Sequence, residues 1–106
     1  MRNVDFYKEE YVDMKTVYKY HLNDEAETVI QVPPGEKILN VGYDAAGRKS
    51  LWALVDTRFE PRPVVIYQLG TGWPLDEAVE LDQLEYINSL RDGEYIWHYF
   101  RKMWGK

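Results

Sequence analysis

The stretch LEYINSLRDGEYIWHYFRK, residues 84–102, decides which fold this sequence can adopt. Two runs rich in apolar and aromatic residues flank Asp92-Gly93. An Asp-Gly pair between such runs is the strongest short-range signal for a β-hairpin, because a type I′ turn needs positive φ at both central residues. The second run, YIWHYF, is large at every position, so this strand is either covered on both faces or offers one face to another surface.

Upstream of this hairpin, five short runs have the length and composition of β-strands and are separated by turn residues. They are residues 14–22, 28–32, 37–44, 50–56 and 63–69. The first run alternates polar and apolar residues, which is typical of a half-buried strand. The run at 50–56, SLWALVD, is nearly all apolar, which predicts a central strand with Trp52, Leu54 and Val55 largely buried.

Six or seven short strands with turn signals between them predict an all-β fold, or a β-rich α+β fold. The expected architecture is a small antiparallel sandwich or a partly open barrel. Residues 1–13 have no clean period and predict an N-terminal arm or short helix, ahead of a single β-rich domain over 14–106. A helical turn is expected over 75–81, within the long irregular stretch 70–82. Because exposed edge strands need a cover, we expect the arm or a second copy of the chain to cover one edge, which makes a homodimer a candidate assembly.

The composition argues against several classes of protein. The chain has no cysteine, which removes thiol chemistry, disulfides and most structural zinc sites. Its two histidines, His21 and His98, are far apart in sequence, so no metal or other cofactor is expected. No run approaches the roughly 20 apolar residues that span a bilayer, so no membrane partner is expected. The formal net charge of −5 makes nucleic acid an unlikely partner, because long-range attraction to it is unfavourable.

No catalytic set stands out in the sequence. Neither of the two serines, Ser50 and Ser89, lies in a Gly-x-Ser-x-Gly elbow. Ser89, His98 and Asp92 can be drawn as a triad only because one hairpin brings them together. We therefore predict that the protein is not an enzyme. The alternative is a small enzyme or a small-ligand-binding domain with a cleft near Trp73 and Asp56.

An acidic and aromatic surface is the strongest functional signal. Residues 71–90 contain five carboxylates and no lysine or arginine, and the chain has nine tyrosines and four tryptophans. Tyrosine and tryptophan recur at protein interfaces because they bury much area at low entropy cost. The predicted partner-binding residues are Trp73, Asp76, Glu77, Glu80, Asp82, Glu85, Trp97 and Tyr99.

Several motifs occur in a recognisable order along the chain: TVYKY at 16–20, VPPGEKILNV at 32–41, LWALVD at 51–56, GTGWP at 70–74 and WHYF at 97–100. In these motifs the chain resembles a family of small uncharacterised bacteriophage and prophage proteins, classed as a domain of unknown function. Family members often carry histidine where this chain has Trp73. The resemblance implies a phage origin and action in the cytoplasm of the bacterial host, and it supplies no activity or catalytic residues.

These observations lead to one main hypothesis and two alternatives. The main hypothesis is a non-enzymatic phage accessory protein that binds a host or defence protein with a basic surface and inhibits it. The first alternative is the small enzyme or ligand-binding domain described above. The second is a structural component that assembles with itself, for which a symmetric apolar interface would be the mark.

Overall fold

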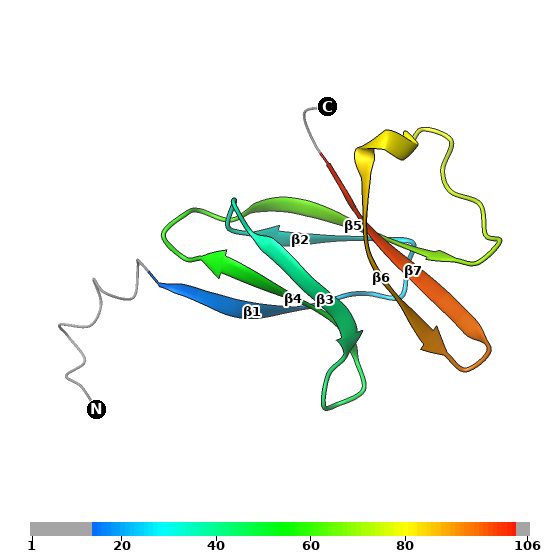
Figure 1. Cartoon of the computed structure of the whole chain (residues 1–106), viewed down its shortest axis with the longest axis horizontal. Coiled ribbons are helices and arrows are strands. Elements are labelled where there is room, and N and C mark those ends of the chain that lie inside the picture. Colours follow the sequence, from blue (N-terminus) through cyan, green and yellow to red (C-terminus); the bar gives the residue numbers. More distant parts are fainter. Residues whose placement is uncertain (1–13, 104–106) are drawn as a thin grey trace.

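The computed structural model describes residues 14–103, which form two antiparallel β-sheets. The three-stranded sheet has the order β1-β4-β3 and the four-stranded sheet the order β2-β5-β7-β6 (Figure 1). The elements are β1 (Lys15–His21), β2 (Glu27–Val32), β3 (Lys37–Tyr43), β4 (Lys49–Asp56), β5 (Arg62–Gly70), the 3-10 helix η1 (Leu81–Gln83), β6 (Leu84–Asp92) and β7 (Tyr95–Lys102). The predicted arm at 1–13 lies outside the described residues.

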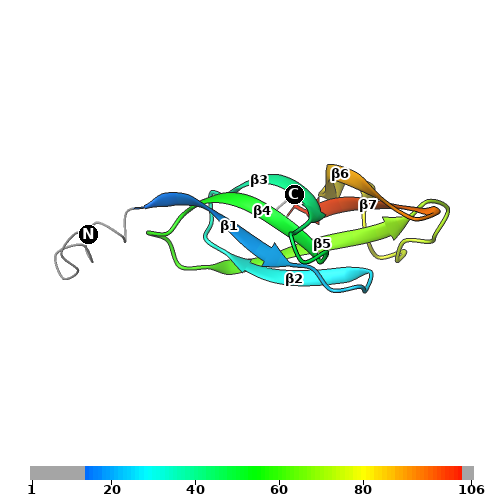
Figure 2. The same cartoon turned by 90° about the horizontal axis from the view of Figure 1, so that it is seen from below.

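The two sheets pack face to face, which confirms the predicted antiparallel sandwich of six or seven strands. Figure 2 shows β1, β4 and β3 as one layer above β2 and β5. The inward-facing residues of β4 are Leu51, Ala53 and Val55, and they meet Val64 and Ile66 of β5 in the core. Burial of this apolar surface between the layers is the main favourable term in folding.

The prediction that Leu54 is buried was wrong. Leu54 is 41% exposed and Trp52 is half-buried, whereas Val55 is buried as predicted. Successive side chains of a strand point to opposite faces, so only every second residue of β4 can enter the core. The apolar side chains between them lie on the outer face of the three-stranded sheet, which no other element of residues 14–103 covers.

The closing hairpin is confirmed, but its turn lies one residue later than predicted. Asp92 pairs with Tyr95, which leaves Gly93 and Glu94 as the two loop residues. Gly93 has φ of 63°, and no other residue type has positive φ in the described part of the chain. Glycine at the first central position is the mark of a type II′ turn, so the predicted type I′ turn was wrong.

The side chain of Asn88 joins the edges of the two sheets. Asn88 Nδ2 donates to the Val41 carbonyl at 2.9 Å, and Asn88 Oδ1 accepts from the Val41 N–H at 2.8 Å. This amide completes backbone hydrogen bonds that β3 and β6 do not make with each other directly. Bulges between Ile38 and Asn40 in β3 and between Tyr86 and Asn88 in β6 accompany this contact. The bridge links the two sheets along one side of the sandwich, but the strands do not form a closed barrel.

The long connection between β5 and β6 is irregular until its end. The predicted helical turn over 75–81 is not formed there; a single 3-10 turn at Leu81–Gln83 leads into β6 instead. Pro74 precedes the expected turn, and Asp76 organises its own hydrogen-bonded turn over the next residues. Such local side-chain bonds to the backbone compete with helix formation.

Candidate protein-binding surface

Trp73 is exposed but held in one position by the turn that follows β5. The Trp73 N–H donates to the Gly70 carbonyl at 3.0 Å, and Gly72 has φ of 83°, as the third position of a type II turn requires. The indole lies over Gly70, where an added Cβ would stand 3.2 Å from three ring atoms. Trp73 is nevertheless 54% exposed. The turn therefore presents a large aromatic side chain that is already ordered.

Trp73 belongs to an aromatic strip that also contains Trp97 and Tyr95 of β7. Trp97 lies opposite Gly70 in the strand register, which brings it within reach of Trp73. The two indole rings meet edge to face with centroids 5.1 Å apart, and Tyr95 stacks on Trp97 at 6.0 Å. Both geometries are favourable for aromatic pairs. The structure thus brings together two of the predicted partner-binding residues, Trp73 and Trp97.

A buried polar network supports the strip from beneath. Lys49 Nζ lies 4.9 Å from the Trp97 ring centroid, a cation–π distance, and donates to Gln68 Oε1 at 3.2 Å. The Tyr99 hydroxyl donates to the same Gln68 oxygen. Tyr99 is fully buried, and burial raises the pKa of its hydroxyl well above the ordinary value. The prediction that Tyr99 contacts a partner was therefore wrong; its position on the inward face of β7 places it in the core.

The five predicted carboxylates all lie on exposed residues of the connection between β5 and β6 or at the start of β6. We call residues 71–83 the acidic loop. Asp76 shapes this loop, because its Oδ1 accepts from the Ala78 N–H at 2.8 Å and its carbonyl accepts from the Val79 N–H at 3.0 Å. The exposed acidic residues are Asp76, Glu77, Glu80 and Asp82 of the acidic loop, and Glu85 of β6. Their charges remain open to a partner.

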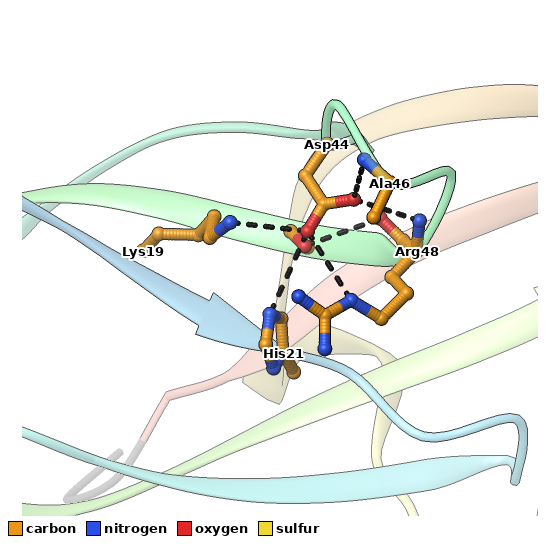
Figure 3. Close-up of polar contacts among 6 residues, drawn as sticks. Lys19, His21, Asp44, Ala46 and Arg48 are labelled. Carbon is orange, nitrogen blue, oxygen red and sulfur yellow. Dashed lines mark hydrogen bonds and ion pairs between the residues drawn. The ribbon is translucent and has the colours of Figure 1, made fainter.

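A second charged centre, which the sequence interpretation missed, lies at the β3–β4 hairpin (Figure 3). Asp44 Oδ2 lies 3.0 Å from Lys19 Nζ, 3.4 Å from Arg48 Nε and 3.6 Å from His21 Nε2. Its Oδ1 accepts from the backbone N–H groups of Ala46 and Arg48, each at 2.9 Å. The Arg48 N–H and the Lys19 ammonium hold the pKa of the Asp44 carboxyl well below its ordinary value.

The Asp44 centre fixes the hairpin and joins it to β1. The sequence signal was Asp44 followed by Gly47, since aspartate at a turn accepts from the backbone two residues on and glycine supplies positive φ. Nothing in the sequence pairs this turn with Lys19 and His21, because strand pairing is non-local.

Asp56 and Trp73 do not share a cleft. Asp56 is the last residue of β4 and Trp73 follows β5, and these two points lie at opposite ends of the molecule (Figure 1). The Asp56 carboxylate accepts from the Arg58 N–H at 3.0 Å and from Arg58 Nη2 at 2.8 Å. These hydrogen bonds lower the pKa of the Asp56 carboxyl, and the bond from the Arg58 backbone N–H has the largest effect. Asp56 thus closes the loop after β4.

Ser89 and His98 do meet, but without a carboxylate. Ser89 Oγ is 2.8 Å from His98 Nδ1, and Thr71 Oγ1 is 2.7 Å from His98 Nε2. Asp92 lies at the hairpin tip, opposite Tyr95. A hydroxyl at each ring nitrogen orients the imidazole of His98 and ties the acidic loop to β7. In a catalytic triad a carboxylate binds the histidine nitrogen that faces away from the serine. In this protein the Thr71 hydroxyl occupies that nitrogen.

Within residues 14–103, no three histidine, aspartate or glutamate side chains are grouped so that they could hold a metal ion. No helix in that range is long and apolar enough to cross a membrane.

Comparison with known proteins gives a family and no activity. No curated protein matches the chain. No solved structure matches it either. A family described as a domain of unknown function (DUF7352) matches residues 14–104, which is most of the 106 residues and contains both sheets, the aromatic strip and the acidic loop. The description of this family names no enzymatic activity. The chain therefore belongs to the DUF7352 family.

Proposed function

We propose that this protein is a non-enzymatic binding protein that contacts a basic protein surface through the aromatic strip and the acidic loop. The observation that carries the proposal is Trp73, which is more than half exposed although packing against Gly70 and Trp97 already fixes its ring. Binding loses less conformational entropy when an anchor is ordered beforehand. Tryptophan anchors of this kind dominate the energetics of many interfaces.

The charge of the acidic loop, which contains the anchor, favours a basic partner. Five carboxylates are exposed in residues 71–90, and no lysine or arginine of that segment neutralises them. Exposed charge of one sign speeds the encounter with a surface of the opposite sign and disfavours like-charged proteins. The acidic loop would therefore select the partner, and Trp73 would hold it.

The biological setting is part of the proposal. The motifs that resemble bacteriophage and prophage proteins support a phage accessory protein that acts in the bacterial cytoplasm. A small protein that covers a basic surface competes with whatever that surface normally binds. We therefore propose inhibition of a host or defence protein as the outcome of binding.

Affinity capture with a matched pair of variants tests this proposal. Tagged wild-type protein, Trp73→Ala and Phe59→Ala are each used to capture proteins from a bacterial lysate at low salt, with identification by mass spectrometry. Phe59 is similarly exposed but follows β4, at the opposite end of the molecule. We expect one protein with a basic surface to be retained by wild type and Phe59→Ala and lost with Trp73→Ala.

Two results would count against the proposal. Equal capture by Trp73→Ala and wild type would remove Trp73 as the anchor. Capture of a partner with an acidic surface would remove the acidic loop as the selecting element. Thermal unfolding of each variant checks that loss of capture is not loss of fold.

A further inference from the structure

The outer face of the three-stranded sheet carries an apolar patch between two lysines. Val17 of β1, Leu54 of β4 and Lys37 of β3 lie in one cross-strand row, and paired residues share a face. Val17 is 47% exposed and Leu54 41%. Lys15 lies in the adjacent row, opposite Asp56. We call Lys15, Val17, Lys37 and Leu54 the basic patch.

The two lysines of the basic patch have no close ion-pair partner among the described residues. Within residues 14–103, neither Lys15 nor Lys37 makes an ion pair closer than 4 Å. Asp56, across from Lys15, is already bonded to Arg58 at 2.8 Å. The apolar surface continues into the next row through half-buried Trp52, beside which Gly42 has no side chain. Among the described residues no further layer covers the patch, which is an apolar surface flanked by cations.

The acidic loop contains the complementary arrangement. Leu81 begins η1 and is 77% exposed, the most exposed large apolar residue in the described part of the chain. Glu80 and Asp82, both exposed, flank it in sequence. This segment complements the basic patch: an exposed leucine can pack on the exposed Val17–Leu54 pair, and the two carboxylates are opposite in charge to the two lysines.

From this match we infer that the basic patch binds the Glu80-Leu81-Asp82 segment of a second copy of the chain. The exposure of Leu81 shows that a molecule does not cover its own segment. Because the two surfaces differ, two molecules either bind reciprocally, patch to loop in both directions, or bind head to tail, which closes into a ring or continues as a filament. The inference rests on the proposed function, because it uses the same acidic loop and names a partner for it. It differs from the symmetric apolar interface that would mark the self-assembling alternative.

Reciprocal charge reversal tests this contact. One variant carries Lys15→Glu and Lys37→Glu, the other Glu80→Lys and Asp82→Lys, and each alone places like charges on both surfaces. Sedimentation velocity at low salt should show wild type as a mixture whose average mass rises with concentration, at least about 2-fold above the monomer for either arrangement. Each variant alone should stay monomeric. An equimolar mixture should regain the wild-type behaviour, because every remaining contact then pairs opposite charges.

A control with the same charge change elsewhere separates this contact from a net-charge effect. Glu25→Lys with Glu94→Lys alters two other exposed carboxylates and should associate like wild type. A monomeric wild-type protein at all concentrations, or two variants that fail to complement each other, would overturn the inference. If the wild type is monomeric while Trp73-dependent capture of a basic partner persists, the inference fails and the proposed function stands.

Discussion

Asp44 shows how one side chain can set a local conformation and a long-range contact together. Its carboxylate is 3% exposed, accepts from two backbone N–H groups of its own turn, and lies within 3.6 Å of three basic side chains. A buried charge costs free energy unless hydrogen bonds and counter-charges compensate it, and here both are present. The ion pairs connect the β3–β4 turn to β1, so the hairpin cannot shift along its neighbour without breaking them.

Asp44→Asn should destabilise the protein in a pH-dependent way. The lowered pKa in the folded state means that the ionised carboxylate stabilises the fold above the ordinary aspartate value of about 3.9, and that this contribution disappears as pH falls through the lowered value. Urea unfolding from pH 7 to pH 3 should show a constant deficit for the variant above about pH 5 that shrinks below pH 4. A deficit of the same size at every pH would show that the charge is not what Asp44 contributes.

Single residues were predicted from the sequence where local chemistry decides their role. Trp73 was predicted to be a partner-binding residue, and the structure shows its indole exposed and packed over Gly70. Tyr99 was misplaced on the surface because YIWHYF is aromatic on both faces, and composition does not say which face meets the core. The turn at Gly93 was misread because Asp-Gly favours two hairpin registers, and the pairing of β6 with β7 selects the later one.

Among the elements, β3 and β6 meet through side chains: Asn88 makes two hydrogen bonds to Val41, and the Tyr43 hydroxyl donates to the Arg91 carbonyl at 3.3 Å. Each of these strands is the edge of its sheet, and an unpaired edge exposes backbone donors and acceptors. Asn88 satisfies the N–H and the carbonyl of Val41 together, as a backbone amide would. The bridge thus links the two layers on one side of the sandwich.

Replacement of Asn88 by leucine should cost stability out of proportion to its size. Leucine has nearly the same volume but leaves the Val41 N–H and carbonyl without a partner, at a cost of about 2 to 4 kcal/mol in the free energy of unfolding. Asn40→Leu, the same change at an exposed position of β3, should cost less than about 1 kcal/mol. Chemical denaturation of both variants measures the difference. Equal losses would mean that the amide bridge does not stabilise the fold.

The strands themselves were predictable, and their arrangement was not. Period-two alternation and turn residues located β1 to β5 within one or two residues, because both signals act over a few positions. The order β2-β5-β7-β6, the two bulges and the Asn88 bridge follow from contacts between segments up to 47 residues apart. Such contacts reflect which apolar faces can be buried together, and a single strand does not encode its partner.

At the scale of the whole molecule, charge and exposed apolar surface are unevenly distributed. The aromatic strip lies where β5 ends and β7 begins, and the acidic loop runs from there to the opposite end of β6. The basic patch lies on the outer face of the other sheet. Of this layout the sequence indicated the acidic segment, since its five carboxylates are close in sequence. The basic patch draws its lysines from β1 and β3 and its leucine from β4, so only the fold assembles it.

The most direct test of the account is the association rate of the captured partner with the wild type and with a variant that combines Asp76→Asn with alanine at Glu77, Glu80, Asp82 and Glu85. Asparagine keeps an Oδ1 acceptor for the Ala78 N–H, and exposed loop charges contribute little to stability, so the variant should fold normally. Because salt screens exposed charge within about 10 Å at 0.1 M ionic strength, the variant should associate about 10-fold more slowly than wild type at low salt and at a similar rate at high salt. Equal association rates at low salt would contradict the claim that the acidic loop selects a basic partner.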